Sequence, residues 1–596
     1  MSQHETLLHE LVHEVRAGRL ARRQFIARLV AWGIEVPLAA AMLPDRADAS
    51  DTSSDWVYKP SRRGGGHIGI LLWQGPTILN PHFATGTKDQ EACRPFYEPL
   101  ARYDADGNLV PVLAAEIPSR RNGDIAADGR STIWKLKRDV VWHDGRPFTA
   151  DDVVFNWQYA THPAASAFTG GFFANVRDIE KIDSHSVRVN FERPTPIWSR
   201  GCNVPIVARH VFEPHLGARS GEVPADVKPM GTGPYTFVSF RPGDLVVGQA
   251  NPRYHMANRP YFDSLEIKGG GDAVSAARAV VQSNEFDFAW NVLAEDDVLA
   301  ALQANGTGRV VYRPTGNVEM ILLNASDPWT DMEGERSNPH SSHFAFSDPA
   351  VRQAFGHLID RRGIERHLFG RAAAATFNVL NHPPEFDSIG TIADFDIDRA
   401  NAVLENAGWR RGSDGIRSRN GHRLHLLYQT STNSARQKIQ AIVKHACAKA
   451  GIELELKAVD ASVFFSSDPG SPDTFGKFYA DMEMYLASRG GGTDPDRFMQ
   501  QWTSWEICRR SNGWLRQNKS RWHSPDYDRM FRDSENELDP VKRAALFMQM
   551  NDLVCHTGHA IPIVTRAQVS AVGKDIQAPL SGWDLALSGL HDWYRG

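Results

Sequence analysis

The sequence has 596 residues, more than one hydrophobic core accommodates, so two or more domains are expected. Hydrophobic residues make up 42% and charged residues 23%, the ordinary composition of a soluble globular protein. The 66 basic and 71 acidic residues give a net charge of −5, which excludes the basic surface that holds nucleic-acid phosphates.

Residues 1–49 differ from the rest of the chain and indicate an export signal. Arg22 and Arg23 lie in Ala21–Ala27 (ARRQFIA), which matches a twin-arginine export motif. An Ala-rich apolar run continues to Leu43, and Ala47-Asp48-Ala49 fits the small-x-small pattern with cleavage after Ala49. We therefore expect the twin-arginine export machinery to be a partner of this protein.

The same segment has a second interpretation. Arg28 and Glu35 interrupt the apolar run, so the two arginines can instead belong to a basic helix. The run is too short and too charged for a stable membrane anchor. No cysteine stands at the cleavage point to carry a lipid. We favour export, which places a free, unanchored protein in the periplasm.

Metal and cofactor motifs are weak. His9–His13 (HELVH) matches the H-E-x-x-H zinc motif, but it lies upstream of the export motif in a segment expected to be removed. His556 and His559 form a close pair, too few ligands for a site. The five cysteines include no C-x-x-C pair, and their odd number leaves at least one thiol free. We predict no metal and no cofactor. The cysteines are Cys93, Cys202, Cys447, Cys508 and Cys555.

The first half of the chain predicts several strands and one well-capped helix. Ile68–Trp73 and Trp134–Val141 are expected strands. Thr149 and Asp152 have the spacing of a capping box, so a helix is expected to begin there. Asp183-Ser184-His185 is an expected hairpin turn.

The second half predicts an alternation of strands and helices. Arg423–Tyr428, Ala435–Ala450 and Ile452–Val459 follow one another as strand, long helix and strand, which predicts a parallel strand pair in an α/β domain. The other expected elements are strands at Tyr235–Phe240, Asp287–Asn291, Tyr312–Asn324, Ala480–Ala487 and Ile561–Val564, and helices at Ala273–Gln282, Asp348–Ile364 and Asp398–Ala407.

Five blocks of the sequence carry a family resemblance. The segment WKLKRDVVWHDGRPFTADDVVF strongly resembles the signature of the family 5 bacterial extracellular solute-binding proteins, which are peptide, oligopeptide and nickel receptors of ABC importers. Similar blocks stand in the expected order from about Ile68 to the C-terminus. The blocks span residues 96–119, 134–155, 230–244, 251–267 and 348–364.

The resemblance implies a type II periplasmic-binding-protein fold of the α/β class, with two lobes and a ligand cleft between them. Lobe I is expected at residues 50–311, with an extra subdomain inserted at about 100–225. Lobe II is expected at 312–555, and residues 556–596 return to lobe I. Hinge closure around the ligand would then favour the closed form.

The resemblance also implies where ligand contacts lie. In this family the loop Leu79–Thr87 borders the cleft, and Thr85, Gly86 and Thr87 offer small side chains and accessible backbone. A plain turn is the alternative for that loop. Asn317 falls where the family's hinge-side loop faces the ligand.

The glycine loop at 488–496 departs from the family's peptide receptors. Their Asp, which binds a peptide amino group, aligns with Gly491, and the nearby Asp494 either substitutes for it or caps the helix at Pro495. The Arg that dipeptide receptors carry before the long helix is also missing, since no arginine occurs there until Arg436. Arg489 is a candidate partner for an anionic group, or a solvated loop residue. A classical dipeptide ligand therefore becomes doubtful.

Trp502, Trp505 and Trp514 follow this loop and can stack on a sugar or a ligand side chain, with core packing as the alternative. No G-x-S-x-G, S-x-x-K or Walker motif occurs, so we expect no enzyme activity and a separate ATPase. We predict a monomeric substrate-binding protein that delivers a peptide or peptide-like solute to an ABC permease. The alternative ligands are an oligosaccharide, an opine-like conjugate or a metal complex.

Overall fold

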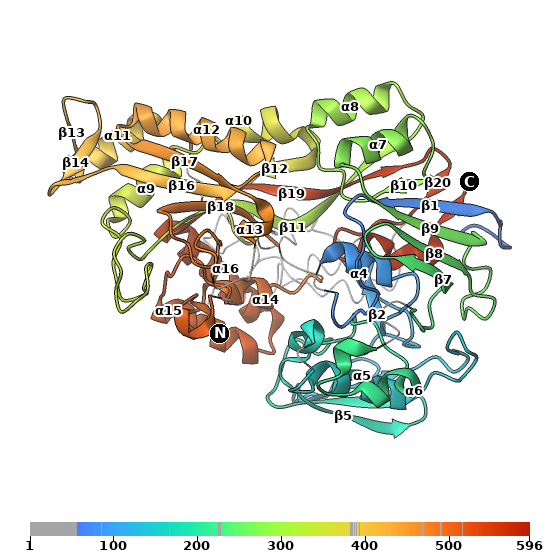
Figure 1. The fold of residues 1–596 in the computed structure, drawn as a ribbon. Coiled ribbons are helices and arrows are strands. Elements are labelled where there is room, and N and C mark those ends of the chain that lie inside the picture. The colour runs from blue at the N-terminus through green and yellow to red at the C-terminus, as the bar shows by residue number, and fades with distance from the viewer. Residues whose placement is uncertain are drawn as a thin grey trace, which may run out of the picture. The chain divides into compact units, whose positions relative to one another are not determined.

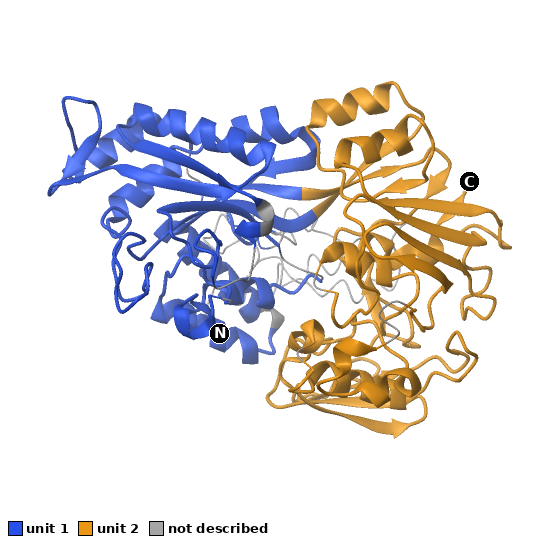
Figure 2. Ribbon diagram, viewed as in Figure 1, with its two compact units in different colours: residues 1–49, 315–566 blue, residues 50–314, 567–596 orange. Residues whose placement is uncertain are grey.

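The computed structural model describes residues 57–596, apart from 85, 106, 166, 224–227, 382–385, 387, 389, 392–393, 466–469, 489–491 and 515. The chain divides into two compact units (Figure 2). In the described part, unit 1 comprises Thr315–Arg566, and unit 2 comprises residues 57–314 together with Ala567–Gly596. The two changes of unit fall inside long strands, β11 (Arg309–Leu323) and β19 (Ala560–Val572).

Unit 2 is built on a sheet with the strand order β19–β10–β1–β9–β8–β7 (Figure 1). The central strand β1 pairs in parallel with β9 and β10, and its residues from Ile68 to Leu72 are all buried, which explains its continuous apolar run. The strands are β1 (His67–Leu72), β7 (Tyr235–Arg241), β8 (Leu245–Ala250), β9 (Ser264–Gly269) and β10 (Phe288–Ala289).

A smaller sheet in unit 2 has the order β4–β6–β5, with β4 at Ser131–Lys135, β5 at Val176–Asp183 and β6 at Ser186–Phe191. The predicted hairpin between β5 and β6 is confirmed. The predicted strand Trp134–Val141 is wrong in its bounds. Lys135 pairs with Ser186, the first residue of β6, so the ladder between β4 and β6 ends there.

Helix α5 (Ala150–Thr161) packs beside this sheet and begins as predicted. The Thr149 backbone N–H donates to the Asp152 carboxylate at 2.9 Å, and the reciprocal half of the capping box is also present. The remaining elements of unit 2 are α4 (Thr87–Cys93), β2 (Ala101–Tyr103), β3 (Leu109–Pro111), η2 (Phe168–Phe173), α6 (Arg209–Phe212), η3 (Glu213–His215), η4 (Ser220–Glu222), α7 (Ala273–Val281), α8 (Asp296–Ala304), β20 (Ile576–Gln577), η12 (Ala586–Asp592) and β21 (Tyr594–Arg595).

Unit 1 has the strand order β17–β16–β18–β11–β19, with β12 (Ala373–Ala375) on β19. The predicted strand–helix–strand unit is confirmed: β16 (His425–Ser431) leads through α12 (Ser434–Lys449) to β17 (Glu453–Val459), and the two strands pair in parallel. Strand β18 (Met482–Ala487) is parallel to β16 and antiparallel to β11.

Further helices and short strands complete unit 1. The expected helix Asp348–Ile364 is divided into α9 and α10, because residues 358–360 do not continue the helix. The elements are α9 (Pro349–His357), α10 (Arg361–Ile364), η6 (Glu365–Phe369), η7 (Gly370–Ala372), α11 (Ile397–Asn406), β13 (Arg410–Arg411), β14 (Arg417–Arg419), β15 (His422–Arg423), α13 (Ala461–Phe464), α14 (Asp496–Met499), η9 (Gln500–Trp502), η10 (Ser504–Glu506), η11 (Arg510–Asn512), α15 (Pro525–Asn536) and α16 (Pro540–Thr557).

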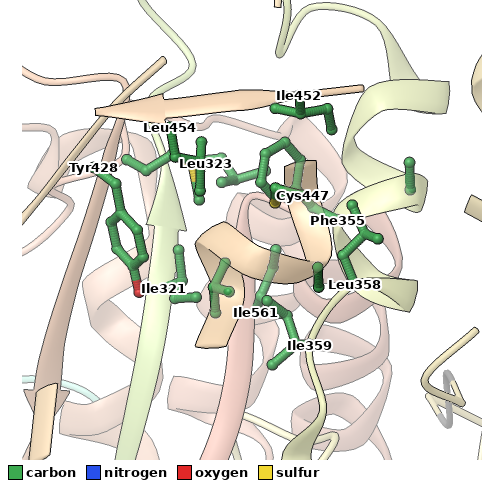
Figure 3. Packing of buried hydrophobic residues seen from close by; sticks show 14 of the residues in the cluster. Ile321, Leu323, Phe355, Leu358, Ile359, Tyr428, Cys447, Ile452, Leu454 and Ile561 are labelled. Carbon is green, nitrogen blue, oxygen red and sulfur yellow. The ribbon is translucent and has the colours of Figure 1, made fainter. Parts of the chain in front are cut away.

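Apolar packing holds the helices of unit 1 on its sheet. Figure 3 shows Ile321 and Leu323 of β11 near Leu454 of β17, with Phe355 of α9 and Cys447 of α12 in the same cluster. All five side chains are at most 1% exposed. Each such side chain contributes roughly 2 kcal/mol through burial, so this layer fixes the strand ends that carry the polar groups described next.

Candidate functional site

The carboxyl ends of two parallel strands meet at one edge of the unit 1 sheet. Strand β16 ends at Ser431 and β18 ends at Ala487. Val318 of β11 pairs with Ala487, so Asn317 lies directly before this last pair and Ser488 directly after it. Ligands of α/β proteins bind preferentially beyond the carboxyl ends of parallel strands. We therefore take this edge as the candidate site of unit 1.

Three charged side chains lie at this edge. The Glu319 carboxylate on β11 is fully buried, and Arg436 Nε on α12 donates to Glu319 Oε1 at 2.5 Å. Arg566 Nη1 on β19 lies 3.6 Å from Glu319 Oε2. Arg436 also donates from Nη1 to Ser431 Oγ at 2.7 Å, which attaches its guanidinium to the end of β16. The two guanidinium groups thus share one carboxylate.

This cluster carries an excess of positive charge in a buried place. The side chains of Arg436 and Arg566 are 13% and 14% exposed. Burial lowers the pKa of Arg566 from its usual value, while Glu319 acts in the opposite direction. Arg566 Nε has no hydrogen-bond partner among the described residues, and its guanidinium lies 4.3 Å from the centre of the Phe369 ring. A guanidinium with unused donors is suited to a carboxylate or another planar anion.

The predicted residues of unit 1 have different surroundings. Asn317 is half-buried, and its backbone N–H donates to Thr315 Oγ1 at 3.1 Å. Asp494 forms a two-bond ion pair with Arg543, at 2.7 and 2.9 Å, and accepts the backbone N–H of Asp496. Trp502 is 3% exposed and packs edge-to-face on Phe498, so its ring belongs to the core.

In unit 2, Gly86 directly precedes helix α4, and Thr87, its first residue, is exposed. Thr85, Arg489 and Gly491 lie outside the described residues, as do Arg22, Arg23 and the cleavage position at Ala49. Within unit 1 the structure brings Asn317 to the candidate edge. A ligand-binding role for any of these residues stays a prediction.

Sequence reasoning missed Glu319 and Arg566. A signal existed for Glu319, because an acidic residue in the apolar run Val318–Leu323 needs a buried partner to offset the cost of desolvating its carboxylate. No comparable signal existed for Arg566, because its partner Glu319 lies more than a hundred positions earlier in the chain. Arg436 was noted as the first arginine after the expected position, and the structure places its guanidinium at the end of β16.

Comparison with known proteins identifies the family to which this chain belongs. The family model for the middle region of the bacterial extracellular solute-binding proteins of family 5 matches residues 108–507, more than half of the chain. The chain belongs to solute-binding protein family 5. The family resemblance drawn from the sequence is thereby confirmed. Family 5 proteins are substrate-binding receptors of ABC transporters without enzyme activity, so the expectation of no catalysis is also confirmed.

Three relatives illustrate the range of the family 5 proteins. The chain is 24% identical to the glutathione-binding protein GsiB of Pectobacterium atrosepticum over 385 residues, 65% of this chain and 68% of that protein. The oligopeptide-binding protein AppA of Bacillus subtilis, solved with a nonapeptide, has a TM-score of 0.69 at 19% identity and covers 90% of this chain and 100% of its own. NikZ of Campylobacter jejuni, solved with Ni(L-His), has a TM-score of 0.71 at 19% identity and covers 89% and 99%.

These likenesses confirm the predicted fold class, the mixed α/β fold of family 5 periplasmic binding proteins. Among the residues that the structure describes, no helix combines the length and apolar character that crossing a bilayer needs. In the same residues, no three His, Cys, Asp or Glu side chains gather as metal ligands.

Proposed function

We propose that this family 5 protein is the periplasmic receptor of an ABC importer, binds a peptide or peptide-like solute, and delivers it to the permease. The observation that carries the proposal is the likeness to AppA over the whole length of that oligopeptide receptor. Transport energy comes from a separate ATPase. We also propose that the twin-arginine segment around Arg22 and Arg23 directs export, and that the mature protein is a free monomer.

The candidate edge of unit 1 refines the expected ligand. Arg436 and Arg566 together carry one more charge than Glu319 neutralises. A ligand with a carboxylate would supply the missing negative charge and accept hydrogen bonds from guanidinium donors. The ring of Trp502 lies in the core, so it is left out of the proposed contacts. The remaining contacts of the proposal are those expected from the sequence: Thr85, Gly86, Thr87, Asn317, Arg489, Gly491 and Asp494.

The same charge supports a second candidate. NikZ was solved with Ni(L-His), and NikA of Brucella suis with Fe(III)-EDTA, both of which are chelates that carry carboxylates. This charge disfavours a neutral oligosaccharide but not an opine-like conjugate, which carries carboxylates. The first alternative ligand is an anionic metal complex. In that case the metal is part of the solute and needs no ligands from the protein.

The decisive experiment is native mass spectrometry of the protein purified from its own periplasm, before and after mild denaturation. A released mixture of peptides supports the proposal. A single mass with a metal isotope pattern supports the chelate alternative, and a single neutral sugar refutes the charge argument. If the protein is empty, titration calorimetry with peptide and metal–chelate panels decides between the two.

Site placement is tested separately with the identified solute. Alanine at Asn317, Thr87, Arg489 and Asp494 together is expected to weaken binding at least tenfold. The exposed Arg529, which pairs with Asp526 on α15, offers a matched control that should leave affinity unchanged. Unchanged affinity in the fourfold variant would show that the predicted contacts are misplaced.

A further inference from the structure

The two ends of a short loop in unit 1 lie side by side, and each end carries a buried side chain with a nucleophilic atom. Residues 508–519 leave the core after η10 and come back beside it. The Cys508 N–H donates to Asn518 O at 3.0 Å, and the Asn518 N–H donates to Glu506 O at 2.8 Å. The two ends of the loop are therefore adjacent strands of backbone, as in a compact Ω-loop.

The side chains of the two end residues, Cys508 and Lys519, are in contact. Lys519 Nζ lies 3.4 Å from Cys508 Sγ. Both residues are buried, with Cys508 at 0% and Lys519 at 6% exposure. Among the described residues no carboxylate lies within ion-pair distance of Nζ; the group donates instead to Arg516 O and lies 4.4 Å from the centre of the Phe475 ring.

The surroundings of this sulfur are cationic and polar. Arg521, 1% exposed, interacts electrostatically with the Cys508 thiol, and Sγ lies 2.9 Å from Arg516 O. Reactive cysteines occur beside lysine and arginine, because a cation stabilises the sulfur anion that attacks an oxidant. Burial raises the pKa of the Cys447 thiol above its usual value, which makes Cys447 a suitable control for an unreactive thiol.

We infer that Cys508 and Lys519 form a redox cross-link, a covalent sulfur–nitrogen bond that closes the loop 508–519. The oxidant is a peroxide. In the first step the Cys508 sulfur attacks one peroxide oxygen, the O–O bond breaks, water leaves, and the thiol becomes a sulfenic acid. In the second step the Lys519 ammonium releases a proton to water, and the resulting neutral amine attacks that sulfur. The S–N bond forms, the S–O bond breaks, and a second water leaves.

The sum is one thiol, one amine and one hydrogen peroxide giving one S–N link and two waters, so sulfur is oxidised and peroxide is reduced. Because Sγ is fully buried, the oxidant reaches it during local opening of the loop.

The cross-link would fix a segment that contacts other parts of unit 1. Trp514, inside the loop, donates from Nε1 to Glu335 Oε1 at 3.1 Å, and the Lys477 ammonium lies 4.8 Å from the centre of its ring. An oxidising compartment such as the periplasm would favour the loop with the Cys508–Lys519 cross-link.

The test is peptide mapping of the full-length protein after treatment with hydrogen peroxide. The expected product joins the peptides that contain Cys508 and Lys519, has two hydrogens fewer than the sum of the two peptides, and disappears on treatment with dithiothreitol. Cys508→Ser and Lys519→Arg should each abolish it, whereas Cys447→Ser, which removes another buried thiol, should leave it unchanged.

Three results would overturn the inference. These are a Cys508 that stays reduced, a Cys508 that is oxidised in the unsubstituted protein without any joined peptide, and a joined peptide that survives in Cys508→Ser. Because Lys519→Arg keeps the positive charge, its thermal unfolding checks that loss of the cross-link does not simply reflect a misfolded loop.

Discussion

Replacing Glu319 by glutamine removes the negative charge that two buried arginines share. The amide keeps the size of the side chain and can still accept one hydrogen bond from Arg436. It cannot balance the charge of Arg436 and Arg566, whose side chains are 13% and 14% exposed. The variant therefore isolates the electrostatic part of the cluster.

The expected loss follows from the burial of the cluster. Removing one partner from a buried ion pair costs roughly 3–5 kcal/mol, because the remaining charge stays desolvated without compensation. Residual exposure of both arginines, and the hydrogen bond that glutamine keeps, place Glu319→Gln near the lower end, at about 3 kcal/mol. A second substitution, Arg566→Met, removes one of the two uncompensated charges and should recover part of the loss.

The assay is urea unfolding followed by amide hydrogen exchange in β16 and β18, which lie wholly in unit 1 and therefore report it separately from unit 2. Asp526→Asn is the matched control, because Asp526 pairs with Arg529 at the surface and its loss should matter little. A loss below about 1 kcal/mol for Glu319→Gln, or no recovery in the double variant, would refute the assignment of a buried, charge-coupled cluster.

Three further predictions concern folding. His82 is fully buried, and burial lowers its pKa from 6.5 to about 4. Because the unfolded chain takes up the proton first, the free energy of unfolding should fall by about 3 kcal/mol as the pH drops from 6.5 to about 4. His82→Gln should flatten that part of the pH profile, which urea unfolding measures. Gly231→Ala would place a Cβ 1.8 Å from Phe96 O, so we expect a lowered Tm or insoluble protein, whereas alanine at Gly221, where a Cβ meets nothing within 4 Å, should be tolerated. Leu426→Ala removes a side chain with 0% exposure in the unit 1 core and should cost about 2–5 kcal/mol in urea unfolding, and a loss under 1 kcal/mol would contradict the packing described.

Local signals predicted elements well where the whole cause lies in neighbouring residues. The capping box of Thr149 and Asp152 specified the start of α5, because both hydrogen bonds form within one turn. The alternation from Arg423 to Val459 predicted a parallel pair, since a long helix is the ordinary connection between parallel strands. Element ends were less predictable. Trp134–Val141 has the composition of one strand, but β4 ends at Lys135 because its partner begins at Ser186.

The charged cluster at the candidate edge could not be predicted from the sequence for a similar reason. Glu319, Arg436 and Arg566 come from three separate elements, and their proximity depends on the strand order of unit 1. Family resemblance directed attention to Asn317 and Asp494 instead. Asp494 is held by Arg543, a partner 49 positions further along the chain that its own neighbours do not reveal.

The division of unit 2 between both ends of the chain has a consequence for synthesis on the ribosome. In the described part of the chain, unit 1 is one continuous segment, whereas unit 2 needs its last 30 residues, Ala567–Gly596. These supply Val572 to the sheet beside Phe288, place the fully buried Trp593 against that phenylalanine, and give two backbone N–H groups to the buried Glu91 carboxylate. Unit 1 thus has all of its core residues in one stretch of the chain, whereas unit 2, although its first residues emerge from the ribosome earlier, can complete its core only after the last residues are released. A message truncated after codon 566 would therefore yield a chain in which the half made last is folded and the half made first is exposed to proteolysis.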